Sequence, residues 1–202
     1  MTEPVTAKVD AKVLLDALNR VKHAAATDEA RPILMSVVIE GLDDDSLRVS
    51  AADNYRIATM RVWVHETSAA FPRVVVPIED GVPVLVALLK AAPKGSSAVL
   101  MANVASDKPT LAIDTTIGSG EVRLVYGTYP DIDAIIGPSL GYKRLISVNP
   151  KYLADAGKAT PDAVIEFRFE AWDKPILITA NDSDYAELVM AVRVPADGDR
   201  VA

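Results

Sequence analysis

The stretch AADNYRIA, residues 51–58, holds the side chains best suited to chemistry in this sequence. Its Asp-Asn pair is typical of a tight turn, because those side chains bond their own backbone and tolerate left-handed conformations. A turn requires neither the aromatic ring of Tyr55 nor the guanidinium of Arg56, and Ile57 follows where the next strand begins. Taken alone, these side chains could form an ordinary surface turn in which the guanidinium stacks on the ring.

Candidates for catalysis and metal binding are few. His23 and His65 have no motif that links them to a serine or a carboxylate, so each is expected to be a surface residue. The acidic run 43–45 lies in a predicted hairpin turn, where adjacent carboxylates point into solvent. Octahedral metal sites draw their ligands from several elements. The sequence contains no phosphate loop, dinucleotide fingerprint or HExxH motif, so it predicts no enzyme, no cofactor and no metal site.

Composition predicts a globular protein of one domain or two small ones. The chain has 202 residues, half of them hydrophobic, and no cysteine, which excludes disulfides, thiolate zinc sites and cysteine nucleophiles. A net charge of −7 argues against a surface that is basic throughout, although a local basic lining remains compatible with it. The N-terminus lacks a signal-peptide pattern and no apolar run could span a bilayer, so we expect a cytoplasmic protein that binds no membrane.

The same order of predicted elements occurs three times, and each pass consists of a strand, a helix and three strands. Val/Ile-rich runs bounded by Asp, Gly, Asn and Pro predict the strands, and apolar spacing predicts the helices. The first pass comprises residues 5–10, 11–26, 33–41, 46–53 and 55–64; the second 73–78, 81–92, 97–104, 110–114 and 120–127; the third 143–148, 149–158, 163–169, 175–180 and 185–194. The fold class is therefore α+β, with three repeated motifs.

Helix starts are marked by Asp10 before Ala11 and by Asn149 before Pro150. Residues 128–142, which are rich in turn formers, predict a linker or crossover. Two such motifs can cover one shared layer with their helices, whereas a single motif leaves a face exposed. The third motif has no mate among the other two, so the pattern favours an oligomer.

This pattern and five short stretches resemble the bacterial DNA polymerase III β subunit, the sliding clamp. The matching stretches, in the family's order, are LLDALNRVKHAAATDEARPILMSVVIEG, AADNYRIA, YPDIDAIIGP, NPKYLADA and DYAELVMAVRV. The resemblance implies a DNA-clamp fold in which residues 1–132 form a complete two-motif domain like the family's middle domain. Residues 133–142 are then a linker, and residues 143–202 resemble the final half of the family's last domain.

In this family two walls form a pocket for short peptides of polymerases, clamp loaders and repair proteins. Carried over position by position, the walls are Asn54, Tyr55, Arg56 and Ile57, then Val189, Met190, Val192, Arg193 and Val194, with Pro138 near the crossover. Tyr55 replaces a family His, and Ala191 replaces a Pro. An apolar groove with Met can adapt to varied partners. The residues of VMAVRV could also be an ordinary terminal strand.

The resemblance also implies that polar helix faces line a ring around double-stranded DNA and meet its phosphates without reading sequence. On the first helix, at about 100° per residue, Val13, Leu14, Ala17, Leu18 and Val21 fall on one side. The expected DNA-facing cations are Lys12, Arg20, Lys22, Lys90, Lys94, Lys151 and Lys158. A simply solvated helix face explains the same charges equally well.

The leading hypothesis is a processivity factor that tethers DNA polymerase and clamp-loader-type proteins to encircled DNA. The family ring contains twelve motifs, so three per chain would require a tetramer whose unpaired motifs pair between subunits. The alternative is an adaptor or decoy that binds clamp-binding peptides without encircling DNA. A third possibility is an interaction protein whose pocket has decayed.

Overall fold

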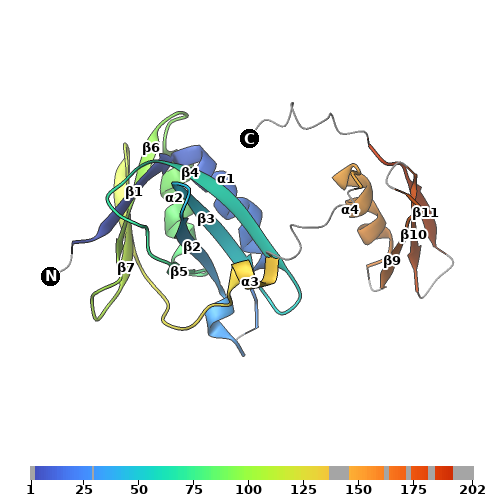
Figure 1. Ribbon diagram of the computed structural model, residues 1–202, viewed down its shortest axis with the longest axis horizontal. Coiled ribbons are helices and arrows are strands. Elements are labelled where there is room, and N and C mark those ends of the chain that lie inside the picture. Colours follow the sequence, from blue (N-terminus) through green and yellow to red (C-terminus); the bar gives the residue numbers. More distant parts are fainter. Residues whose placement is uncertain are drawn as a thin grey trace. The chain divides into compact units, whose positions relative to one another are not determined.

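The computed structural model divides the chain into two compact units, unit 1 (Met1–Ile132) and unit 2 (Asp133–Ala202). The residues that it describes are 3–28, 30–136, 146–161, 164–171, 174–181 and 185–192. Each unit is described by itself (Figure 1). Among the described residues, no helix is long and apolar enough to cross a membrane.

Unit 1 contains the first two predicted passes of strand, helix and three strands. The elements of the first pass are β1 (Val5–Asp10), α1 (Ala11–Val21), β2 (Ser36–Leu42), β3 (Ser46–Ala52) and β4 (Ile57–Thr67). Those of the second are β5 (Val74–Pro77), α2 (Val82–Ala91), β6 (Ser97–Asn103), β7 (Thr110–Thr115) and β8 (Gly118–Arg123). Two short 3-10 helices, η1 (Lys22–Ala24) and η2 (Pro32–Leu34), lie between α1 and β2. Every strand and helix predicted for these two passes is present.

One eight-stranded sheet unites the two passes, in the order β5-β2-β3-β4-β1-β6-β7-β8. The leading strand of each pass pairs with the other pass, since β1 lies between β4 and β6 and β5 pairs with β2. The backbone N–H of Val125 also donates to the carbonyl of Val75 at 2.9 Å, which brings the end of the sheet back to β5. The sheet is therefore nearly closed, and exchanged leading strands hold its halves together.

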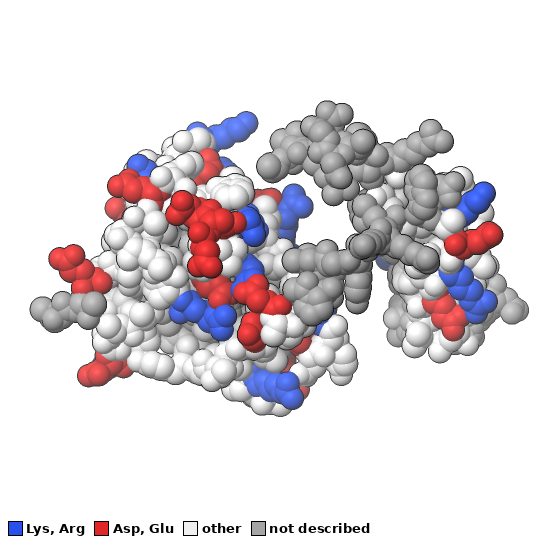
Figure 2. Space-filling view, viewed as in Figure 1, with Lys and Arg blue, Asp and Glu red and all other residues white. Residues whose placement is uncertain are grey.

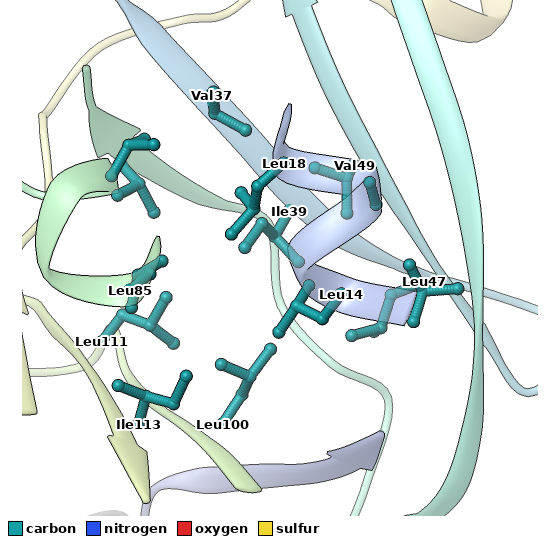
Figure 3. Packing of buried hydrophobic residues seen from close by; sticks show 14 of the residues in the cluster. Leu14, Leu18, Val37, Ile39, Leu47, Val49, Leu85, Leu100, Leu111 and Ile113 are labelled. Carbon is teal, nitrogen blue, oxygen red and sulfur yellow. The ribbon is translucent and has the colours of Figure 1, made fainter. Parts of the chain in front are cut away.

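The core of unit 1 lies between the sheet and the two helices. Leu14 and Leu18 of α1 and Leu85 of α2 point toward Ile39 and Leu100 of the sheet (Figure 3). All five are 0% exposed. Apolar burial of this extent contributes roughly 1.5–3 kcal/mol for each large side chain relative to leaving it exposed. This packing places α1 and α2 against each other and so fixes which helix faces remain at the surface.

The first helix differs from its prediction in two respects. Val13, expected on the buried side, is 40% exposed, and Ala11 is buried instead. The reason is that α2 and the sheet together cover the helix, so the buried face is centred on Leu14, Leu18 and Val21. The α-helix also ends at Val21 rather than at residue 26, because the chain tightens there into η1.

Side-chain caps start two of the helices as predicted. The Oδ1 atom of Asp10 accepts from the backbone N–H groups of Lys12 and Val13 at 2.7 and 3.0 Å. In unit 2 the Oδ1 atom of Asn149 accepts from the N–H of Lys151 at 2.9 Å. Both caps satisfy amides that the helix itself leaves unbonded.

Among its described residues, unit 2 contains the helix α4 (Pro150–Ala159) beside a three-stranded sheet, and α3 (Ile132–Ile136) lies at the boundary between the units. Its strands are β9 (Ile165–Arg168), β10 (Ile176–Ala180) and β11 (Ala186–Val189), with the sheet order β11-β10-β9. Ala156, Ile176, Ile178 and Val189 form its buried core.

The leading strand predicted for unit 2 does not form within its described residues, and the final strand is shorter than predicted. Residues 143–145 of the predicted leading strand lie outside the described residues, and 146–148 form no strand. The backbone N–H of Val192 nevertheless donates to the carbonyl of Ser147 at 2.7 Å, so this segment lies beside the end of β11. The final predicted strand ends at Val189 rather than at residue 194. Among the described residues a single backbone hydrogen bond joins these two segments, which is too short a ladder to count as strand.

Candidate functional site

The turn between β3 and β4 is held by its own aspartate. The Oδ1 atom of Asp53 accepts from the backbone N–H groups of Tyr55 and Arg56 at 2.7 and 2.9 Å. Its Oδ2 atom accepts from the Nε of Arg56 at 2.9 Å, and its own N–H donates to the Arg56 carbonyl at 3.0 Å. The N–H of Tyr55 and then the Arg56 side chain lower the pKa of Asp53 below its ordinary value of 3.8, although partial desolvation opposes them. The turn is therefore preformed.

This turn presents its functional groups outward. Tyr55 is 94% exposed, so nothing in the described structure covers its ring. Asn54 and Arg56 are exposed and Ile57 is half-buried at the start of β4. Arg56 pairs with Asp53 and is not stacked on an aromatic ring. The structure shows a cation–π contact elsewhere, with the Cζ atom of Arg61 5.6 Å from the centroid of the Trp63 ring.

A buried tyrosine supports the turn from below, and the sequence reasoning gave it no role. The backbone N–H of Ala52 donates to the hydroxyl of Tyr129 at 2.8 Å, across 77 residues of chain. Burial raises the pKa of Tyr129, while the bond from Ala52 opposes that shift. Tyr129 belongs to the stretch YPDIDAIIGP, whose turn-forming residues suggested only a linker. It fixes the end of β3 immediately before Asp53.

The second predicted wall lies in unit 2, and the structure separates its members by burial. Val189 is part of the buried core, so it supports the wall from behind. Met190 and Val192 are both exposed, and the Val192 backbone is held by Ser147. Pro138, Arg193 and Val194 lie outside the described residues.

Two of the predicted DNA-facing cations bond closely to neighbouring protein groups. The Nζ of Lys12 donates to the carbonyls of Leu89 and Lys90 at 3.1 and 2.9 Å, at the C-terminal end of α2. Arg20 forms an ion pair with Asp16 of the same helix at 2.7 Å.

The remaining cations are exposed and more loosely placed. The Nζ of Lys22 donates to Asn19 at 2.8 Å. Lys158 lies 3.6 Å from Asp155, while Lys90, Lys94 and Lys151 are exposed. Figure 2 shows basic and acidic side chains interspersed on the face of unit 1 that it displays. Among the described residues, the cations on this face of unit 1 are separated by acidic side chains (Figure 2).

The candidates for catalysis and metal binding are surface residues. His23, His65 and the acidic run 43–45 are exposed. Within that run Asp44 pairs with Arg61, and Asp45 adopts a left-handed conformation with φ of 55°. Among the described residues, no cluster of His, Asp or Glu could hold a metal ion. Sequence reasoning also missed an apolar cavity of about 350 Å³, which is lined by Lys22, Ile78, Val82, Pro83, Val86 and Ala87.

Comparison with known proteins identifies the family. Residues 8–131 match the family model of the DNA polymerase III beta subunit, central domain. The chain belongs to the DNA polymerase III β subunit family. No curated protein matches the sequence significantly.

Solved structures of the clamp family share the fold over nearly the whole chain. The DnaN sliding clamp from Bartonella birtlesii, bound to griselimycin, is 21% identical with a TM-score of 0.74, over 95% of this chain and 52% of that one. The DNA polymerase III subunit beta from Pseudomonas aeruginosa is 19% identical with a TM-score of 0.74, over 93% and 51%. The sliding clamp from Bacillus subtilis is 18% identical with a TM-score of 0.70, over 92% and 49%. This chain therefore has the sliding-clamp fold and spans about half the length of these relatives.

Proposed function

We propose that this protein is a sliding-clamp-like processivity factor, which tethers polymerase, clamp-loader or repair proteins to DNA by binding their short peptides. It performs no chemical step of its own. The observation that carries the proposal is the preformed turn of residues 53–56, which projects an uncovered aromatic ring from a clamp-family domain. A soluble fold has no structural need to hold Tyr55 in this position.

The turn of unit 1 is the proposed peptide site, and the resemblance to the clamp family adds the exposed tail residues Met190 and Val192 of unit 2 as expected contacts. Tyr55 and Ile57 offer apolar surface, and Met190 can adapt to different partner side chains. Arg56 is already oriented by Asp53, so binding costs little additional side-chain entropy. The expected ligand is an extended peptide with a leucine or phenylalanine anchor and a group that accepts a hydrogen bond from the guanidinium.

A titration with a fluorescent clamp-binding peptide tests this site. Arg56→Ala and Met190→Ala should each weaken binding by about tenfold, which corresponds to roughly 1.4 kcal/mol. Leu188→Ala is the matched control for Met190, because the two residues are 62% and 61% exposed and lie two positions apart. Wild-type protein that does not bind, or variants that bind as tightly as wild type, would disprove the assignment.

Encirclement of double-stranded DNA by a ring of four chains is the second part of the proposal. Exposed Lys90 and Lys94 would contact phosphates without sequence preference. Retention on nicked circular DNA should disappear when the DNA is linearised, because a closed ring slides off free ends. Equal retention on both forms would exclude encirclement.

The alternative is an adaptor or decoy that binds clamp-binding peptides but does not encircle DNA. One observation favours it: Lys12 and Arg20, expected to meet phosphate, bond to groups of the protein itself. The net charge of −7 also favours this alternative, because a negatively charged protein is repelled by DNA. Peptide binding together with equal, weak retention on circular and linear DNA would select this alternative.

A further inference from the structure

Unit 1 shows how two strand–helix–three-strand halves complete each other. The leading strand of each half pairs with the first strand after the helix of the other half. Thus β1 pairs with β6, with Ala7 opposite Leu100, and β5 pairs with β2. The helices α1 and α2 pack together across the same junction. The strand that follows each helix is consequently covered by the other half.

Unit 2 has the layout of a single half. The segment 146–148 precedes α4 and lies beside the end of β11, as β1 precedes α1 and pairs with β4. Strand β9 follows the helix and occupies the position of β2 and β6. It lies at an edge of its sheet, and β10 is its only strand partner among the described residues. A sheet edge of this kind is a template for pairing with another strand.

Burial shows that this edge is incomplete. Phe167 of β9 lies opposite Ile178, which is buried in the core under α4, so Phe167 belongs to the helix-facing side of the sheet. Helix-facing core residues of the corresponding strands, such as Ile39 of β2 and Leu100 of β6, are 0% exposed, whereas Phe167 is 50% exposed. The side chain that would be covered by a second half is thus open to solvent.

The α4 helix repeats a second feature of the junction. Lys151 follows the N-cap Asn149 by two positions, as Lys12 follows Asp10. Lys12 bonds to the last carbonyls of the neighbouring helix, which holds α1 and α2 together. Lys151 is exposed, and among the described residues its side chain has no partner.

We propose that unit 2 pairs with unit 2 of a second copy of this chain about a two-fold axis, and that the two halves together complete one clamp-type domain. Segment 146–148 of each copy lies along β9 of the other, Phe167 becomes buried, and Lys151 bonds the C-terminal carbonyls of the partner's α4. A two-fold arrangement satisfies both edges at once, so the contact closes. This interface would supply one contact of the proposed ring, but it forms without DNA or peptide. Its failure would open the ring and abolish topological retention on circular DNA, but it would leave peptide binding unaffected, so the peptide titration distinguishes failure of this interface from failure of the proposed function.

Solution mass measured without DNA tests the interface. The wild type should reach at least twice its chain mass of 21.6 kDa, and Phe167→Glu should halve the wild-type mass. Leu188→Glu is the matched control, because Leu188 is also exposed but faces the other side of the sheet, opposite Leu177. Lys151→Met should weaken association at least threefold, while Lys158→Met on the same helix should not.

Cross-linking supplies a measurement that does not depend on a disruptive variant. The chain has no cysteine, so introduced thiols report only the contact under test. Applying the register of β1 on β6 to unit 2 places Ser147 opposite Glu166 of the second copy. A mixture of Ser147→Cys and Glu166→Cys chains should form a disulfide dimer, whereas Ser147→Cys with Leu177→Cys, on the central strand, should not.

Three results would overturn the proposal. The first is a wild type of single-chain mass at every concentration. The second is a Phe167→Glu variant whose mass equals that of wild type, since association would then use another surface. The third is an associated wild type whose Ser147→Cys and Glu166→Cys chains do not cross-link.

Discussion

Replacing Lys12 by Met separates a structural lysine from a DNA-binding one. Its Nζ donates to the carbonyls of Leu89 and Lys90 at 3.1 and 2.9 Å, where the dipole of α2 favours a cation. The variant keeps the length of the side chain but loses both bonds and the charge. We expect unfolding to become easier by about 1–2 kcal/mol, since the ammonium is only half-buried and water replaces part of the loss. For a chain of this size that corresponds to a Tm lower by roughly 2–8 °C.

The assay is thermal unfolding, together with the salt dependence of DNA retention. Lys90→Met is the matched control, because it removes the same charge from an exposed position and keeps the carbonyl that accepts from Lys12. Its Tm should stay within experimental error of wild type. If Lys12 instead contacted a DNA phosphate, Lys12→Met would leave the Tm unchanged. It would reduce the steepness of the plot of log DNA affinity against log salt concentration by about 0.9. That result would refute the structural role assigned here.

Three further predictions concern buried and turn residues of unit 1. Tyr129→Phe should lower stability by about 1–3 kcal/mol, because it leaves the buried N–H of Ala52 without a partner; chemical denaturation measures this. Glu40→Gln should lower it by about 2–4 kcal/mol, because the buried carboxylate accepts from Arg48 at 2.7 and 3.0 Å and from a second guanidinium at 2.6 Å. Asp53→Asn should lower the Tm at neutral pH, and the difference from wild type should vanish as the pH falls below 3.8, because a carboxylate whose folded pKa is depressed stabilises only while ionised.

Controls for these variants come from exposed positions. Tyr152→Phe and Glu121→Gln make the same chemical changes at exposed positions and should leave stability near wild type. Equal effects of Tyr129→Phe and Tyr152→Phe would contradict the role of the buried hydroxyl. A Tm difference for Asp53→Asn that persists unchanged into acid would show that its charge does not hold the turn.

The elements of this fold followed from local signals in the sequence. Asp10 and Asn149 cap their helices through bonds to amides two or three residues away, so composition over a few positions was enough to place both starts. Val/Ile-rich runs bounded by Asp, Gly, Asn and Pro likewise predicted the strands of unit 1. The family also followed from short stretches in a fixed order, and the model of its central domain confirmed it. The turn at Tyr55 was recognised as a candidate site from the sequence alone, because a turn does not require an aromatic residue.

Only the tertiary structure decided what individual side chains do. The sequence offered Lys12 as a DNA contact, but its partners lie 77 and 78 residues away, and no local pattern specifies them. Tyr129 meets Ala52 across a similar separation, and Val189 turned inward because α4 covers that side of its sheet. Phe167 looks like any core residue in a strand, yet it is 50% exposed on β9, whose only strand partner among the described residues is β10. Local bonds are set by the nearest residues, whereas burial and long-range partners are set by which surfaces the fold brings together.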